Sequence, residues 1–232
     1  MCAASDCAAS DCVTNDCAAS DCAANHRTAN DRAANHKEAA AVTTASAATR
    51  EVGGAELPAA GLWKVDPGHA EVAFVGRHFL LTKVRGRFTG VDGEIRIGED
   101  PKASSVTVTI DMASVHSGDG TRDSHLRSAD LFDVANHPTA TFRSTTVAWD
   151  GTSGTLAGDL TIKGVTKPVT LTVGYVGYAQ DPWGNDRAVF SARGRINRED
   201  WGVSWNMPLA RGGLLVSTEI DLELEVELIR QG

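Results

Sequence analysis

The sequence predicts an all-β protein, a single eight-stranded antiparallel β-barrel with one or two short helices, preceded by a disordered N-terminal tail. All aromatic residues (five Trp, two Tyr and six Phe) occur from Trp63 onward, so only that part can fill a sizeable core. It consists of short alternating segments separated by Gly, Pro, Asp and Asn, as is typical of antiparallel sheets. Each segment has one apolar face, and a closed barrel gives these faces a common interior without sheet edges.

Residues 1–60 are the predicted tail and linker, and residues 61–232 the barrel domain. A disulfide set in the tail is disfavoured because the cysteine count is odd and no apolar core accompanies it. Metal binding by the thiolates with His26 or His36 stays open, although the spacing is not that of ordinary zinc sites. We expect a disordered low-complexity repeat, or a start codon assigned too early. The repeated cysteines, one every fifth residue, are Cys2, Cys7, Cys12, Cys17 and Cys22.

Period-two alternation marks the strands of the barrel domain. In residues 105–112 the apolar side chains share one face, and Thr107, Thr109 and Asp111 share the other. The last segment is the clearest, because aliphatic residues from Ile220 to Leu228 alternate with acidic residues that need solvent or partners. About eight strands are therefore predicted, from the alternating segments at residues 72–74, 84–90, 94–97, 105–112, 140–147, 155–163, 169–175, 188–196 and 220–228.

The stretch 121–138 breaks this pattern, because it is polar, charged and predicted to be helical. Apolar residues recur every third position from Leu126 to Phe132, which places them near one another on a helix. Asp119 or Thr121 can cap its start, and Pro138 ends it. Three roles stay open for the polar residues of this helix: catalysis, ligand binding, or holding a lid in place. These residues are Arg122, Asp123, His125 and Arg127.

Charge and hydropathy limit the partners. The net charge of −8 gives no support to nucleic-acid binding, which requires a basic surface. No apolar run approaches the roughly 18 residues of a membrane-spanning helix, so no transmembrane segment is expected. The N-terminus lacks the basic and apolar regions of a signal peptide. We expect a cytoplasmic protein as the chain is written, or a periplasmic or extracytoplasmic one if the true N-terminus differs. A homodimer is left open.

Motifs for catalysis are missing from the sequence. It contains no Gly-x-Ser-x-Gly elbow, His-Glu-x-x-His helix or Walker-type phosphate loop. Asp123 and His125 diverge by about 200° on a helix and cannot easily form an orienting pair. We therefore expect no enzyme, no catalytic residue, no metal site and no cofactor. Histidines this scattered are more often surface residues than metal ligands, and they are His69, His78, His125 and His137.

Ordered motifs over residues 62–228 resemble the YceI-like proteins, a lipocalin-like family of polyisoprenoid or lipid binders. The resemblance implies an elongated, lipocalin-like antiparallel barrel whose apolar cavity takes a long isoprenoid chain, with no established catalytic role. The motifs are Trp63-Lys-Val-Asp66-Pro-Gly-His69, Val72-Ala-Phe74-Val-Gly-Arg-His78, Lys83-Val-Arg-Gly-Arg-Phe88, Arg122-Asp-Ser-His-Leu-Arg-Ser128, Asp130-Leu-Phe-Asp133, His137-Pro-Thr-Ala-Thr-Phe-Arg-Ser144, Gly158-Asp-Leu-Thr-Ile-Lys-Gly-Val-Thr-Lys-Pro168 and Asn197-Arg-Glu-Asp-Trp-Gly202.

The expected ligand is a polyisoprenoid or isoprenoid quinone, held for carriage, storage or sequestration. Two alternatives stay open: an enzyme that modifies an isoprenoid lipid, and a structural or stress-response module with a side-chain-filled core. Gly86, Gly158 and Gly194 fall on inner faces, where they suit bends and leave room inside. The residues expected to line the cavity are Phe74, Phe88, Val106, Val108, Ile110, Phe142, Leu160, Leu171, Phe190, Leu222 and Leu224.

A polar head group is expected to meet charged residues near the helical stretch. The alternative is that Arg122 and Arg127 pair with Asp130 or Asp133 and only fix the helix. The candidates for contacting a phosphate or quinone head are Arg122, His125, Arg127 and, on another segment, Arg85.

Overall fold

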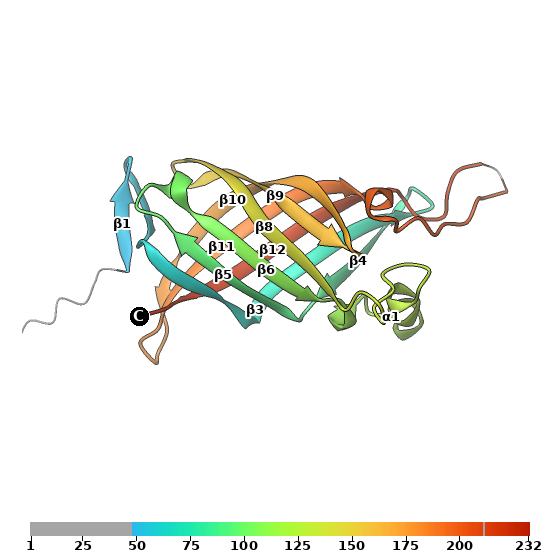
Figure 1. Ribbon diagram of the computed structural model, residues 1–232, viewed down its shortest axis with the longest axis horizontal. Coiled ribbons are helices and arrows are strands. Elements are labelled where there is room, and N and C mark those ends of the chain that lie inside the picture. Colours follow the sequence, from blue (N-terminus) through green and yellow to red (C-terminus); the bar gives the residue numbers. More distant parts are fainter. Residues whose placement is uncertain (1–47, 211) are drawn as a thin grey trace, which may run out of the picture. The chain divides into compact units, whose positions relative to one another are not determined.

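The computed structural model of the chain describes residues 48–210 and 212–232. The cysteine repeat, with the expectations of disorder or metal binding attached to it, lies outside the described residues. The described part contains an antiparallel barrel closed by eight strands, as predicted (Figure 1). In ring order the strands are β3 (Gly61–His78), β5 (Val91–Ile97), β6 (Ser105–Asp111), β8 (Thr139–Asp150), β9 (Ser153–Ile162), β10 (Val165–Gln180), β11 (Asp186–Asn197) and β12 (Glu219–Arg230).

Closure depends on the long strand β3. It pairs with β12 from Val75 opposite Asp221 to Trp63 opposite Arg230, with one irregularity in the register between Val226 and Leu228. On its other side, residues 61–64 pair with β5, and residues 72–78 pair with β4 (Thr82–Phe88), which is extended by β7 (Val115–His116). Both sides of β3 are thus hydrogen-bonded, and the sheet becomes a ring.

A hairpin of β1 (Thr49–Val52) and β2 (Ala55–Pro58) precedes the barrel. The prediction of an unstructured linker is wrong for these residues. Gly53 and Gly54 adopt positive φ angles of 59° and 81°, which suits the tight turn. Arg50 then ties the hairpin to the barrel, because its guanidinium donates to the Glu99 carbonyl at 2.6 Å. The alternation in these two strands is too short to be recognised in the sequence, and contacts with the barrel stabilise the hairpin.

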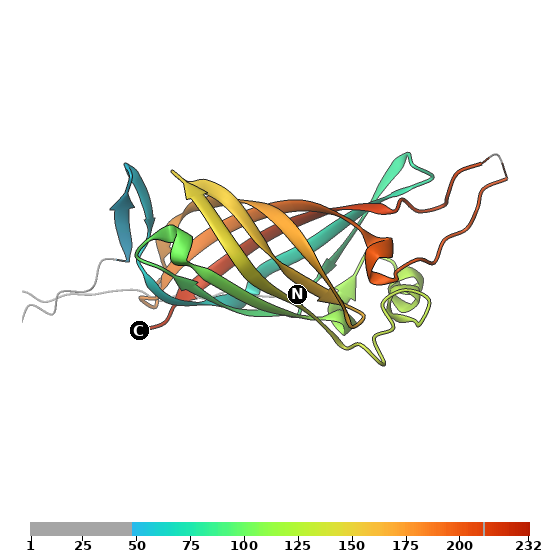
Figure 2. The same ribbon diagram turned by 45° about the horizontal axis from the view of Figure 1, so that its top comes forward.

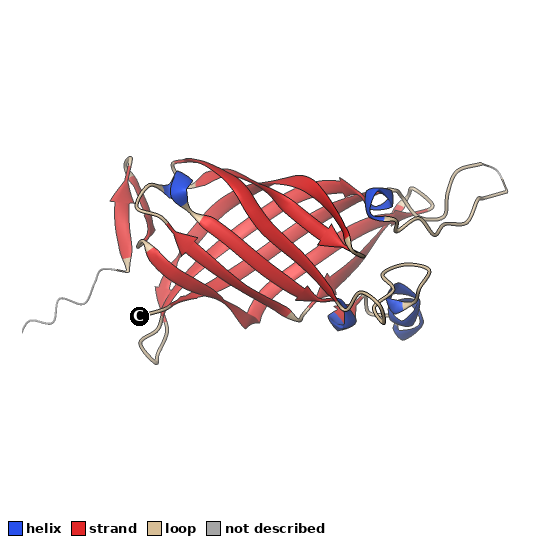
Figure 3. Cartoon of the chain, viewed as in Figure 1, coloured by secondary structure: helices blue, strands red, loops and turns tan. Residues whose placement is uncertain are grey.

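The short helices lie at the two ends of the barrel (Figure 3). α1 (Gly120–Arg127) and η3 (Arg198–Trp201) lie at the same end, on the right in Figures 1 and 2, which we call the helical end. η2 (Met112–Ser114) precedes β7 at this end. The hairpin and η1 (Pro101–Ala103) lie at the opposite end, which we call the hairpin end.

Helix α1 is shorter than predicted. Asp119 caps its start, since its carboxylate accepts the Arg122 amide at 2.9 Å. The helix ends at Arg127, well before Pro138, because the following chain turns back and satisfies the last carbonyls. The Phe132 amide donates to the Leu126 carbonyl at 3.0 Å, and the Val134 amide donates to that of Arg127 at 3.0 Å. Leu126 and Phe132 nevertheless pack against the core, as their spacing predicts.

Glycines on the inner faces do not leave empty room, and that expectation is wrong. A Cβ atom at Gly86 would lie 2.8 Å from both Cε atoms of Phe74, which is opposite in the register. Phe142 covers Gly158 in the same way, and Leu171 Cδ2 would lie 2.6 Å from a Cβ at Gly194. Each glycine lets a large side chain lie flat against the neighbouring strand.

Replacing Gly86 by Ala is expected to destabilise the domain by about 1–3 kcal/mol, because the Phe74 ring must move out of its place. Thermal denaturation measures this. Gly177→Ala in β10 is the matched control, since nothing lies within 4 Å of a Cβ there. Equal melting temperatures for the two variants would show that the Phe74 ring has room to shift.

Candidate binding site

The barrel encloses a cavity of about 710 Å³. Ligand pockets of proteins usually measure about 300–1,000 Å³, so this space can take a small molecule or part of a long chain. All eleven residues predicted to line a cavity do line it, from Phe74 on β3 to Leu224 on β12. Their contact with a ligand stays a prediction. An open cavity counts against the alternative of a side-chain-filled core.

The apolar lining follows from strand geometry. Alternate residues of each strand point inward, so the aliphatic side chains of β12 face the cavity while its carboxylates face outward. Aromatic rings gather in two places on this wall. Phe88 lies 5.5 Å from Phe74 and 5.7 Å from Phe132, measured between ring centroids. Phe190 lies 6.3 Å from Trp149. The wall of the cavity therefore offers apolar contacts to a ligand.

Polar residues line the cavity at the helical end. Arg122, one of the predicted head-group residues, lines it and donates to the Ser117 hydroxyl and carbonyl, both at 2.7 Å. His125 lines it too, 3.5 Å from the Asp130 carboxylate. Its ring meets that of Trp205 edge to face, with centroids 4.4 Å apart. These two predicted residues are thus placed where a head group could reach them.

The other two predicted head-group residues do not line the cavity. Arg127 turns away from it and donates to the Ala113 and Val115 carbonyls at 2.9 and 2.7 Å, so it fastens α1 to the preceding segment. Arg85 lies on the outer face of β4, where it pairs with Glu71 at 3.0 Å and with Glu223. The reason is the strand period, because Phe88 and its alternates occupy the inner face.

Asp123 is held as a carboxylate. Its side chain is buried and accepts hydrogen bonds from the Ser117 hydroxyl and amide, and it lies 3.3 Å from His116. The Ser117 hydroxyl bond is the largest of the effects that lower the pKa of Asp123, and burial opposes it. A general base works best with a pKa near neutrality, so this group is poorly suited to that role. Asp123 instead fixes the loop that leads into α1.

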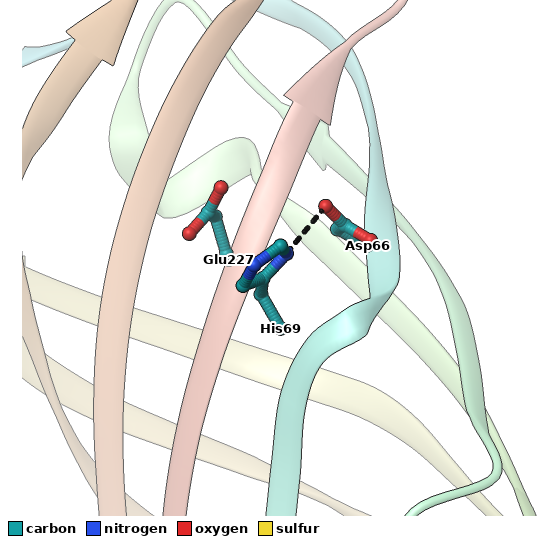
Figure 4. Close-up of side chains that lie close together, drawn as sticks. All are labelled: Asp66, His69 and Glu227. Atoms are coloured by element: carbon teal, nitrogen blue, oxygen red, sulfur yellow. Dashed lines mark hydrogen bonds and ion pairs between the residues drawn. The ribbon is translucent and has the colours of Figure 1, made fainter. Parts of the chain in front are cut away.

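One group of potential metal ligands lies on the outer surface among the described residues, formed by Asp66, His69 and Glu227 (Figure 4). The Asp66 carboxylate bonds the His69 ring at 3.0 Å. Arg187 bridges the two acids, since its Nη1 atom donates to Asp66 at 2.6 Å and also to Glu227. Its guanidinium supplies the positive charge that a metal ion would bring. The cluster is an ion-pair network that stabilises the irregular part of β3.

Residues that sequence reasoning missed complete the lining. They come from the short hairpin and from η3 and the segment after it, where no sustained period indicates which side chains point inward. Arg50 and Leu57 belong to the hairpin, and Arg198, Trp201 and Trp205 belong to η3 and the segment after it. The Trp201 indole donates to the Leu160 carbonyl at 3.0 Å, which fixes η3 against β9. The motif Asn197–Gly202 indicated that this segment belongs to the family pattern, but it did not predict which of its side chains point into the cavity.

No helix in the described ranges is long and apolar enough to cross a membrane. The comparisons agree with the barrel. Protein YceI from Escherichia coli O17:K52:H18 (strain UMN026 / ExPEC) is 42% identical over 164 residues, which cover 70% of this chain and 83% of that protein.

Two solved structures share the fold. Burkholderia cenocepacia BcnA has a TM-score of 0.62 and 24% identity, over 70% of this chain and 98% of that one. A polyisoprenoid binding domain from Saccharophagus degradans has a TM-score of 0.52 and 18% identity, over 73% and 98% of the two chains. The YceI-like domain model matches residues 63–228, which span the closed barrel from the buried Trp63 of β3 to Leu228, near the end of β12. The chain therefore belongs to the YceI-like family.

Proposed function

We propose that the protein binds a long-chain apolar lipid, a polyisoprenoid or an isoprenoid quinone, inside the barrel. The observation that carries this proposal is the cavity of about 710 Å³ with its apolar wall. A fold relative described as a polyisoprenoid binding domain supports the ligand class. The protein acts by carriage, storage or sequestration of the lipid, and not as an enzyme.

The apolar chain of the ligand supplies most of the affinity. Burying ten CH₂ groups gains on the order of 8 kcal/mol before the costs of ordering are subtracted. A hydrogen bond to a charged head adds only about 1.5–3 kcal/mol. The wall therefore binds the chain, and polar groups at the end of the cavity orient it.

Protein purified from its own cells is expected to carry a prenyl lipid, detected by native mass spectrometry as a mass above that of the chain. Val108→Trp should abolish uptake of an added isoprenoid, because the indole fills the cavity beside β6. Thr109→Trp is the matched control, as Thr109 is the next residue on the same strand and is exposed.

Two results would contradict the proposal. One is protein that is consistently empty and also ignores added isoprenoids. The other is equal uptake by the Val108 and Thr109 variants, which would place the lipid outside the barrel. A bound lipid recovered in chemically altered form would instead favour the enzyme alternative.

A further inference from the structure

Arg198 carries an unsatisfied hydrogen-bond donor inside the barrel. The residue is 8% exposed and lies at the start of η3. Its Nε atom donates to the Ser217 carbonyl at 3.0 Å, and its Nη1 atom donates to the Val203 carbonyl. Its Nη2 atom is buried and has no hydrogen-bond partner within the described residues. Buried polar atoms in folded proteins are nearly always bonded, so this one requires an explanation.

The charge of Arg198 also has no directly bonded carboxylate partner among the described residues. Its neighbours Trp201 and Val203 are buried and apolar or aromatic. Burial lowers the pKa of Arg198, with an opposing effect from Glu199, but a guanidinium stays protonated at neutral pH. A buried cation with an unpaired N–H group is costly, and an anion bound from outside would supply the missing partner through a strong charge-assisted hydrogen bond.

The surroundings of Arg198 favour an anion as well. Arg198 lines the same cavity as the apolar wall, and Arg77 and Arg122 line its helical end with it. Asp119 is the single carboxylate among the described lining residues, and its oxygen is engaged by the α1 amide of Arg122. A ligand head placed at this end meets several guanidinium groups and little negative charge.

We propose that Arg198 anchors the ligand's head, its Nη2 donating to an anionic oxygen of a phosphate or diphosphate ester. This rests on the proposed function, since the lipid chain must occupy the cavity. The head then lies at the helical end of the barrel, and the isoprenoid chain extends from it along the apolar wall towards the hairpin end. Sequence analysis assigned this role to Arg122, His125, Arg127 and Arg85, and the geometry points to a residue outside that group.

The test compares ligands that share one prenyl chain and differ only in the head: a monophosphate, a prenylated quinone and the hydrocarbon. Affinities are measured by displacement of a fluorescent fatty probe or by calorimetry. Arg198→Gln is expected to weaken binding of the monophosphate about ten- to hundredfold, the range that one charge-assisted hydrogen bond accounts for. Binding of the hydrocarbon should change by less than about twofold, because the wall that holds the chain is intact.

Arg198 also donates to two backbone carbonyls, so its replacement can lower the affinity of the site for every ligand. Each variant is therefore judged by the ratio of its monophosphate affinity to its hydrocarbon affinity, which an equal loss in both leaves unchanged. Arg127→Gln is the matched control, since Arg127 likewise donates to two backbone carbonyls near this end but does not line the cavity. Its ratio should equal that of the unaltered protein.

The outcomes separate the two proposals. If the unaltered protein does not bind the hydrocarbon chain, the proposed function fails. If it binds the chain but Arg198→Gln leaves the ratio unchanged, only the anchor is overturned. A loss confined to the quinone overturns the assignment to an anion, and an equal change in Arg127→Gln overturns the assignment to Arg198.

Discussion

Trp63→Ala is expected to lower the free energy of unfolding by about 3–5 kcal/mol, a large share of the stability of a domain this size. The Trp63 side chain is 0% exposed and belongs to the main core cluster. It lies where β3 pairs with Ile95 of β5 on one side and Arg230 of β12 on the other. Its indole also donates to the Ala59 carbonyl at 3.1 Å. Truncation leaves both a void and an unpaired acceptor at the closure of the ring.

Urea denaturation followed by circular dichroism measures this change in unfolding free energy. Trp183→Ala is the matched control, because the Trp183 side chain is 82% exposed in the turn between β10 and β11, and its loss should change stability by less than about 0.5 kcal/mol. Trp63→Phe should fall between the two, since it retains most of the volume and loses the donor. A Trp63→Ala variant as stable as the Trp183 control would show that the ring closes without this side chain.

Arg187→Met is expected to destabilise the domain by about 2–4 kcal/mol, somewhat less than the loss of a fully buried pair. Arg187 joins three carboxylates from separate segments: Asp66 at 2.6 Å, Asp181 at 2.8 Å, and Glu227. Without the guanidinium, these mutually repelling groups remain close together in a partly buried place. Chemical denaturation at neutral pH measures the loss of stability.

The effect of Arg187→Met should shrink in acid. The hydrogen bond from Arg187 is the main cause that lowers the pKa of Asp66 from 3.8 to about 2. A carboxylate whose pKa is lower in the folded than in the unfolded state stabilises the fold at pH values above its unfolded-state pKa. This contribution is lost as the pH falls towards its folded-state pKa. The unaltered protein should therefore lose this part of its stability between about pH 4 and pH 2, while the variant has none of it to lose.

Arg195→Met is the matched control for Arg187→Met. Arg195 makes a pair with a single carboxylate, Asp221, at 2.6 Å, and its side chain is 66% exposed. An exposed pair contributes less than about 1 kcal/mol, so this variant should stay close to the unaltered protein. The proposed role of the Asp66 pair is wrong if the difference in unfolding free energy between the Arg187 variant and the unaltered protein stays constant down to about pH 2.

The sequence by itself determined the closed barrel and its inner wall. Successive side chains of a strand point to opposite faces, so a period-two pattern places Val106, Val108 and Ile110 on one side whatever the strand pairs with. The Asp119 cap is equally local, because a carboxylate before a helix bonds an amide three residues later. Such features depend only on neighbours in the chain, and the family motifs add to them.

The tertiary structure alone decided the partners of the charged groups. Arg187 meets Asp66, 121 positions away, and Arg198 meets the carbonyl of Ser217 because the pairing of β11 with β12 places Asn197 opposite Glu219. The length of α1 and the outward direction of Arg85 and Arg127 depend in the same way on which segments come together. A guanidinium on a long, flexible side chain follows no backbone period. Its partners and its access to the cavity are set by the geometry of the closed ring, which no stretch of sequence contains.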